Sequence, residues 1–193
     1  MSLSRLFLKG ANALVSFVVA VFLVVAGAYS VYALWDNEQI YAAADNVQAD
    51  MIKLKPKITV AESEEEEEGA TFAELLAINK DVRAWVTVDN TNIDFPVVQG
   101  EDNLSYINTD IYGNFALAGS IFLDSRNAPD FSDAYSLLYG HHMANSGMFG
   151  DLDLFKDERF FNDNRTGMLI LPDRVYNLEI YACLLVRDRK SVV

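Results

Sequence analysis

Two adjacent histidines and one cysteine are the side chains of this chain best suited to proton transfer and nucleophilic attack. The chain has 193 residues, with two His and one Cys. His141 and His142 follow an apolar run and Gly140, a pattern typical of side chains held at the rim of a rigid strand. A neutral imidazole there suits proton transfer to or from an amine or a thiol. From this pattern alone, a structural histidine pair is the alternative interpretation.

The single thiol, Cys183, lies in the apolar run Leu178–Val186. A cysteine among small apolar side chains is usually inert packing, so we expect no nucleophile here. A small cysteine hydrolase that pairs Cys183 with His141 is kept only as a third hypothesis. One Cys also excludes an internal disulfide framework and a cysteine-rich zinc site, and two His leave little for a histidine metal site. We therefore expect no metal site built from Cys or His side chains.

Short strands must position these residues. Residues 82–89 alternate between apolar and polar side chains with the period of a half-buried strand. A capping box at Thr71–Glu74 predicts a helix through Ile78, and residues 149–161 look partly helical. The other predicted strands are 93–98, where Pro96 indicates an edge or a bulge, 119–124, 135–139, and a hairpin formed by 168–171 and 175–186. This pattern predicts a mainly β chain with an antiparallel barrel or sandwich.

The N-terminal segment is apolar enough to cross a membrane. Ala11–Trp35 contains no charged residue and is long enough for a ~30 Å hydrocarbon core. Arg5 and Lys9 precede it, while Asp36 and Glu38 follow it. The positive-inside rule therefore places the N-terminus in the cytoplasm and the rest outside the cell membrane. A cleaved signal peptide is the alternative, but the apolar stretch is longer than such peptides need.

Acidic residues dominate the remaining charge. The chain has 28 Asp and Glu against 15 Lys and Arg, for a net charge of −13. This balance argues against nucleic acid as a partner, because phosphate binding needs a basic face. The like-charged acidic side chains of the block Ser63–Gly69 repel one another, and the block has no apolar side chains to form a core. Residues 36–70 are therefore expected to form a polar acidic stalk.

Several segments together resemble the class B sortase family, extracytoplasmic cysteine transpeptidases of Gram-positive-type bacteria. The resemblance covers about residues 71–186, and the segments keep the order found in the family. They are Ile78–Val86, Asn92–Gln99, Asp102–Asn103, Gly119–Asp124, Tyr139–Met143 and Gly147–Leu152. Each segment is modest by itself, whereas the ordered set is specific.

The resemblance implies a closed β-barrel with a few peripheral helices and a catalytic Cys, His and Arg. In this family, the cysteine attacks a sorting signal on a secreted protein and forms a thioester, which an amine of a peptidoglycan precursor or a pilin lysine then releases. The histidine directly after Tyr-Gly is the catalytic one, which is His141 here. Its implied role is acid for the leaving amine and base for the incoming one, and His142 is expected to be dispensable. No cofactor is required.

The chain departs from the family near its end. The stretch resembling Thr-Leu-x-Thr-Cys that carries the nucleophile has no match, nor does the arginine motif, so Arg187 and Arg189 receive no role. Residues 188–193 match the translation of a common sequencing adapter and are interpreted as a non-native tail. The expected division is 1–10 cytoplasmic, 11–35 transmembrane, 36–70 stalk, 71–187 incomplete sortase domain and barrel, and 188–193 tail. The chain itself is expected to be inactive.

A non-enzymatic surface protein is the alternative function. It would use the same anchor and a sortase-like barrel only to bind a partner. Stable, monomeric folding of residues 71–193 would favour this alternative.

Overall fold

A computed structural model describes residues 3–56 and 72–186 of the chain. The chain divides into two compact units, Met1–Ile40 and Tyr41–Val193. The predicted capping residue Thr71, the acidic block at 63–69 and the predicted tail at 188–193 lie outside the described residues. The predicted domain boundaries therefore remain predictions.

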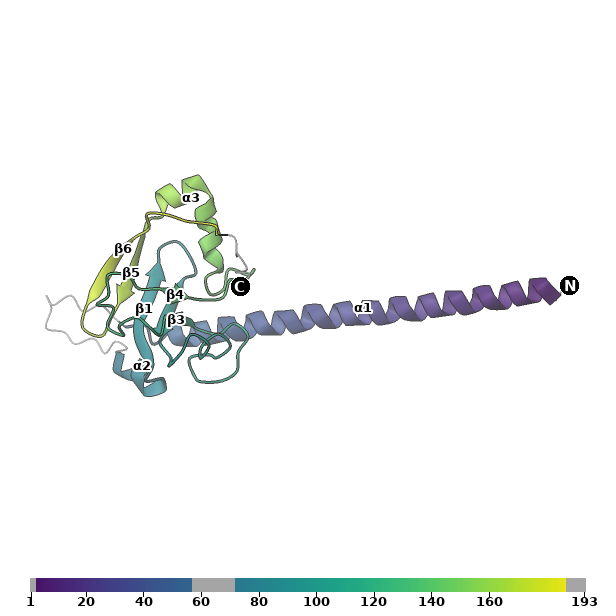
Figure 1. Ribbon diagram of the computed structural model, residues 1–193, viewed down its shortest axis with the longest axis horizontal. Coiled ribbons are helices and arrows are strands. Elements are labelled where there is room, and N and C mark those ends of the chain that lie inside the picture. Colours follow the sequence, from purple (N-terminus) through teal and green to yellow (C-terminus); the bar gives the residue numbers. More distant parts are fainter. Residues whose placement is uncertain (1–2, 57–71, 187–193) are drawn as a thin grey trace, which may run out of the picture. The chain divides into compact units, whose positions relative to one another are not determined.

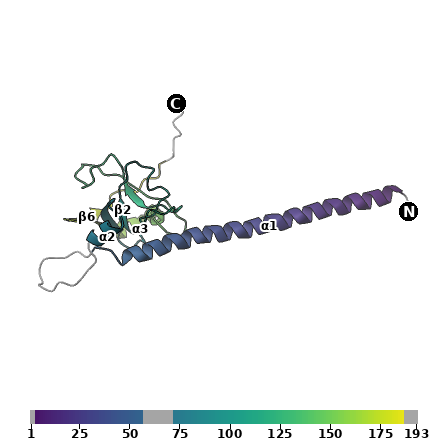
Figure 2. The same cartoon turned by 90° about the horizontal axis from the view of Figure 1, so that it is seen from below.

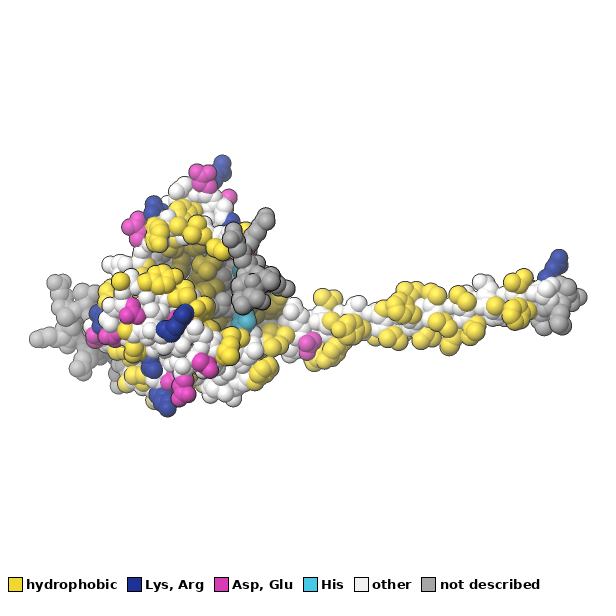
Figure 3. Space-filling model, viewed as in Figure 1, with side chains coloured by type: hydrophobic (Ala, Val, Ile, Leu, Met, Phe, Trp, Pro, Cys, Tyr) yellow, Lys and Arg dark blue, Asp and Glu magenta, His cyan; other side chains and the backbone are white. Residues whose placement is uncertain are grey.

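One long helix, α1 (Leu3–Ile52), begins the described chain and contains 50 residues. Its segment Phe7–Ile52 meets the length and composition criteria for a membrane span, criteria that a signal sequence near the N-terminus also meets. Large hydrophobic side chains from Phe7 to Trp35 are exposed, at consecutive positions that cover every side of a helix, and Figure 3 shows hydrophobic side chains along the face of α1 in view. A helix that is apolar on every side and covered by no protein is suited to lipid rather than to water.

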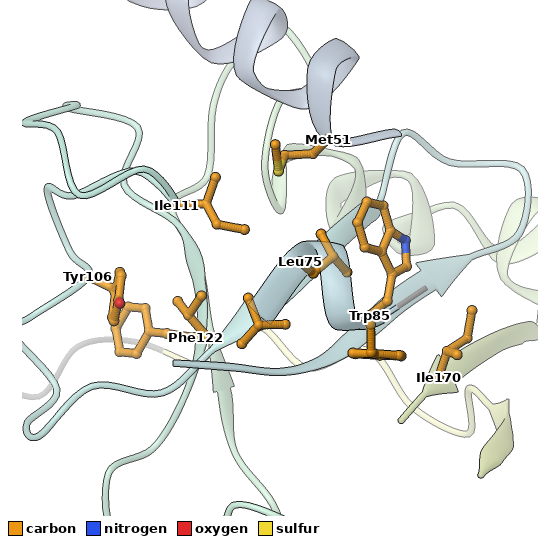
Figure 4. Packing of buried hydrophobic residues seen from close by; sticks show 10 residues of the cluster. Met51, Leu75, Trp85, Tyr106, Ile111, Phe122 and Ile170 are labelled. Atoms are coloured by element: carbon orange, nitrogen blue, oxygen red, sulfur yellow. The ribbon is translucent and has the colours of Figure 1, made fainter. Parts of the chain in front are cut away.

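The last turns of α1 belong to the second unit. Met51 is buried there, at 1% exposed, and packs in the same hydrophobic cluster as Trp85 (Figure 4). Beside it, Gln48 Nε2 donates to the Asn92 carbonyl oxygen at 2.8 Å. Residues in the first part of the predicted stalk thus contribute to the core of the folded unit.

The centre of the folded unit is one six-stranded sheet with the order β4-β3-β2-β1-β5-β6 (Figures 1 and 2). The strands are β1 (Val82–Val88), β2 (Asp94–Val98), β3 (Ile121–Leu123), β4 (Leu138–Tyr139), β5 (Thr166–Ile170) and β6 (Val175–Glu179). Neighbouring strands are antiparallel except β2 and β3, which are parallel. The expectation of a wholly antiparallel sheet is therefore wrong at this pair, because residues 99–120 form a crossover connection.

Side chains of the central strands and of α2 (Phe72–Ile78) form the core. Trp85 and Leu75 are both fully buried and lie near Phe122 and Ile170 in Figure 4. The Trp85 indole N–H donates to Asp94 Oδ1 at 2.5 Å, so the largest core side chain has its polar atom satisfied. Burial of these side chains is the main force that holds the sheet together.

Pro96 lies in the interior strand β2, opposite Trp85, and not at an edge of the sheet. The irregularity of this pair of strands falls between Val82 and Ala84. Since Val88 N donates to Ile93 O, the alternation of an antiparallel ladder makes Trp85 and Pro96 a non-hydrogen-bonded pair. The missing N–H of proline therefore costs no bond to β1, and the prediction of an edge or bulge at this residue is wrong.

The C-terminal half combines short helices with the predicted hairpin. The helices are η1 (Gly150–Lys156) and α3 (Glu158–Asp163), where the Asp157 side chain caps α3 by accepting from two backbone N–H groups. Strands β5 and β6 pair as predicted, but β6 ends at Glu179 instead of continuing to Val186. The prediction of a mainly β chain is also wrong for the described residues, because α1 alone holds 50 residues while no strand exceeds seven.

Candidate functional site

His141 directly follows Gly140, the residue that brings the chain close to the sheet after β4. A Cβ atom on Gly140 would lie 2.3 Å from Ile121 Cδ1 and 2.8 Å from Phe149 Cδ2, so a larger residue would force the chain outward. The His141 imidazole is exposed, and its Nε2 lies 2.8 Å from the carbonyl oxygen of Ile107. A carbonyl oxygen can only accept a hydrogen bond, so Nε2 carries the proton and Nδ1 of the neutral ring keeps its lone pair.

The loop after His141 is tightly folded. The Phe149 N–H donates to the His141 carbonyl oxygen at 2.9 Å. Ser146 and Met148 adopt positive φ angles of 66° and 52°, which are unfavourable for residues with a side chain. Such strain persists only where the surroundings enforce it, as at many functional sites. The loop thus returns the chain to His141 and limits the backbone positions available to it.

His142 has a different partner from His141. Its Nε2 lies 3.1 Å from Asp153 Oδ2, and both side chains are about half exposed. Asp153 also binds Lys156 Nζ at 2.5 Å, and this hydrogen bond, with a smaller one from His142, lowers the pKa of Asp153. His142 therefore connects its loop to η1. The two adjacent histidines face different parts of the protein, one a backbone carbonyl and the other a carboxylate.

A buried carboxylate, Asp124, lies at the end of β3 and was not singled out by sequence reasoning. It accepts from Arg126 Nε at 2.9 Å and Nη2 at 2.8 Å, from Asn103 Nδ2 at 3.0 Å and from Tyr139 Oη at 2.9 Å. The Arg126 hydrogen bonds hold the pKa of Asp124 well below its usual range, and the bond to Asp124 raises the pKa of Tyr139. The only signal in the sequence is an Asp that ends an apolar strand two residues before an Arg.

Cys183 lies beyond the end of β6 and is exposed. Its neighbours Tyr181, Leu184 and Leu185 are each more than 80% exposed, so the expectation of inert packing in a strand is wrong. Among the described residues, no hydrogen bond joins this thiol to either histidine. Arg187 and Arg189, which received no role, lie outside the described residues.

Histidine side chains come to the surface on the face shown in Figure 3, where hydrophobic side chains line a hollow of the folded unit. Within residues 3–56 and 72–186, no three His, Cys, Asp or Glu side chains gather as a metal site would require. The exposed imidazole of His141, whose Nε2 binds a carbonyl oxygen, is a group of the described residues that is suited to proton transfer.

Comparison with known proteins decides the family. No family model matches the chain. A crystal structure described as a Streptococcus pyogenes class B sortase involved in pilus biogenesis is 44% identical, with a TM-score of 0.60, over 66% of this chain and 70% of that one. The chain belongs to the class B sortase family. Class B sortases are cysteine transpeptidases, and the six-stranded sheet described above is part of the sortase fold.

Other sortases agree with this assignment. Sortase B of Listeria monocytogenes is 37% identical over 109 residues, which are 56% of this chain and 44% of that relative. A solved Staphylococcus aureus sortase B–substrate complex is 31% identical, with a TM-score of 0.54, over 56% of this chain and 50% of that one. The chain spans about half the length of the curated sortase B relatives that it matches.

Proposed function

We propose that this chain is part of a class B sortase in which His141 transfers the protons of transpeptidation. Membership of the family and the exposed imidazole of His141, with Nε2 bound to Ile107, support this proposal. In the neutral ring, Nδ1 is free to accept a proton from an incoming amine. The substrates are secreted proteins with a sorting signal, joined to a peptidoglycan precursor or to a pilin lysine.

The reaction has two acyl transfers. A cysteine thiolate attacks the carbonyl carbon of the sorting signal, and the amide C–N bond breaks as the leaving amine takes a proton from the imidazolium. The incoming amine then attacks the thioester, its proton passes to the neutral imidazole, and the thiolate leaves. Each cycle returns the histidine and the thiolate to their starting protonation states, so no cofactor is needed.

A cysteine other than Cys183 is the proposed nucleophile. Cys183 is exposed, lies outside any strand, and has no hydrogen bond to a histidine among the described residues. We propose that the nucleophile and its arginine partner come from further strands that pair with the sheet edges β4 and β6 and complete a closed barrel. The 193-residue chain by itself is then inactive.

The apolar part of α1 is the proposed membrane anchor. Arg5 and Lys9 precede the uncharged stretch that ends at Trp35, so the N-terminus stays in the cytoplasm and the folded unit is extracytoplasmic. A position outside the membrane gives the enzyme access to both secreted proteins and wall precursors.

The test is cleavage of fluorogenic sorting-signal peptides by the protein that the gene encodes when it is read beyond residue 193. We expect thiol-dependent cleavage that His141→Ala lowers by about 10²-fold or more, the usual contribution of general acid–base catalysis. The matched control His142→Ala and the variant Cys183→Ala are expected to retain activity. Cleavage by the 193-residue chain that disappears in Cys183→Ala would show that the nucleophile has been assigned wrongly.

A further inference from the structure

The carboxylate of Asp124 connects two segments that are distant in the sequence. Asp124 is 2% exposed, and its carboxylate accepts from Asn103 Nδ2 at 3.0 Å and from Tyr139 Oη at 2.9 Å. Arg126 satisfies the same carboxylate through Nε and Nη2. A buried carboxylate with this many donors is held in one orientation, because any rotation would break a charge-assisted hydrogen bond.

One of these connections leads directly to His141. Tyr139 is the last residue of β4, and its ring stacks on Phe122 with 5.1 Å between centroids. Only Gly140 separates Tyr139 from His141, and the space around Gly140 is too small for a Cβ atom. The hydrogen bond of Tyr139 Oη to Asp124 therefore anchors the segment that leads into His141.

The other connection leads to the hydrogen-bond partner of His141. Asn103 binds Asp124 with its Nδ2 and accepts from the Ser125 N–H through its Oδ1 at 2.7 Å. Asn103 and Ile107 belong to the same loop, and the Ile107 carbonyl accepts from His141 Nε2. Asp124 thus holds both the segment that carries the imidazole and the loop that carries its acceptor.

We propose that Asp124 is a positioning residue for His141: by binding Tyr139 and Asn103 together, it keeps the Ile107 carbonyl within reach of Nε2 and leaves Nδ1 free. The catalytic role of His141 rests on the function proposed above, whereas the positioning of its imidazole by Asp124 does not. Asp124 touches neither the imidazole nor a reacting atom, so it acts only through its two partners.

The experiment measures the ring nitrogens of His141 by NMR in the full chain, held in detergent micelles and labelled with ¹⁵N-histidine. The variant His142→Gln assigns the two rings. In the neutral ring of the parent protein we expect one tautomer, with separate shifts for a protonated Nε2 and an unprotonated Nδ1. In Asp124→Asn and in Tyr139→Phe, the two nitrogen shifts of His141 should converge as the second tautomer becomes populated, while those of His142 stay unchanged.

Asp110→Asn is the matched control. Asp110 is also a buried carboxylate, but among the described residues it accepts only from Tyr112 and Asn114, within its own turn. The Asp110→Asn variant should leave the ring nitrogen shifts of His141 unchanged, even if this variant lowers the urea unfolding midpoint as much as Asp124→Asn does.

Two results would overturn the positioning role. One is a His141 spectrum that is the same in Asp124→Asn, Tyr139→Phe and the parent. The other is an equal change in Asp110→Asn, which would assign the effect to general destabilisation. If the shifts converge as expected but the longer gene product cleaves no sorting peptide, the proposed function fails and the positioning of His141 stands.

Discussion

At the scale of single residues, the charge of Asp124 is tied to the stability of the fold. Arg126 lowers the pKa of this carboxyl in the folded protein, so the folded state binds its proton less readily than the unfolded chain does. A lowered folded pKa contributes stability that is complete above the unfolded value and is lost as the pH falls. The unfolded value is about 3.9.

Asp124→Asn is therefore expected to destabilise the folded unit at pH 7, with a difference from the parent that shrinks as the pH falls below about 4. Urea unfolding at a series of pH values, followed by the fluorescence of buried Trp85, measures that difference. The prediction would be contradicted if the difference in unfolding free energy between the parent and Asp124→Asn stayed constant from pH 7 down to the lowest pH at which both proteins fold.

The histidine pair illustrates what residue patterns can and cannot predict. The position of His141 after a short strand and a glycine was predictable, because Tyr139-Gly140 is a local pattern. Its acceptor was not predictable, since Ile107 lies 34 residues earlier and reaches the imidazole only through the fold. For the same reason, the sequence did not show that Asp124 is buried and bound to Asn103 and Tyr139.

At the scale of elements, the connection between β2 and β3 depends on one glycine. Gly119 has a φ of +59°, and a Cβ atom there would lie 2.2 Å from the Ile107 carbonyl oxygen and 2.7 Å from that of Tyr106. The connection can therefore approach its own earlier turn only where no side chain is present.

Gly119→Ala is expected to destabilise the folded unit by more than the ~1–2 kcal/mol typical of an alanine in left-handed backbone, because it also displaces the Ile107 carbonyl. Gly113→Ala is the matched control: its φ is +83°, but its Cβ would meet nothing within 4 Å. Free energies of unfolding in urea give the comparison. An equal decrease in the free energy of unfolding in the two variants would contradict this prediction, because the close contact at Gly119 would then add nothing to the destabilisation.

Element types followed from the sequence more readily than their partners did. Period-two alternation correctly predicted β1, and turn residues correctly predicted the β5–β6 hairpin, because both signals are local. The parallel pairing of β2 with β3 was missed, since alternation shows which face is buried but not which strand lies alongside. The end of β6 at Glu179 was also missed, because the apolar run continues beyond the last residue that pairs with β5.

At the scale of the whole molecule, the proposed topology can be tested with the natural thiol. In the 193-residue chain Cys183 is the only cysteine and is exposed, so a membrane-impermeant maleimide should label this chain in intact cells. A variant that carries Ser2→Cys together with Cys183→Ala should be labelled only after lysis, because the N-terminus is expected to face the cytoplasm. Labelling of Cys183 only after lysis would reverse the proposed orientation.

The two tryptophans of the chain report on different environments. Trp85 is fully sequestered in the core with its indole bonded to Asp94, whereas Trp35 stands 58% exposed on α1. The fluorescence of Trp85 changes when the folded unit denatures. Quenching of the Trp35 fluorescence by brominated lipid acyl chains reports the insertion of α1 into a bilayer. The variant Trp35→Phe leaves only the Trp85 signal, and Trp85→Phe leaves only the Trp35 signal. Folding and membrane insertion can therefore be measured separately by fluorescence, without an added label.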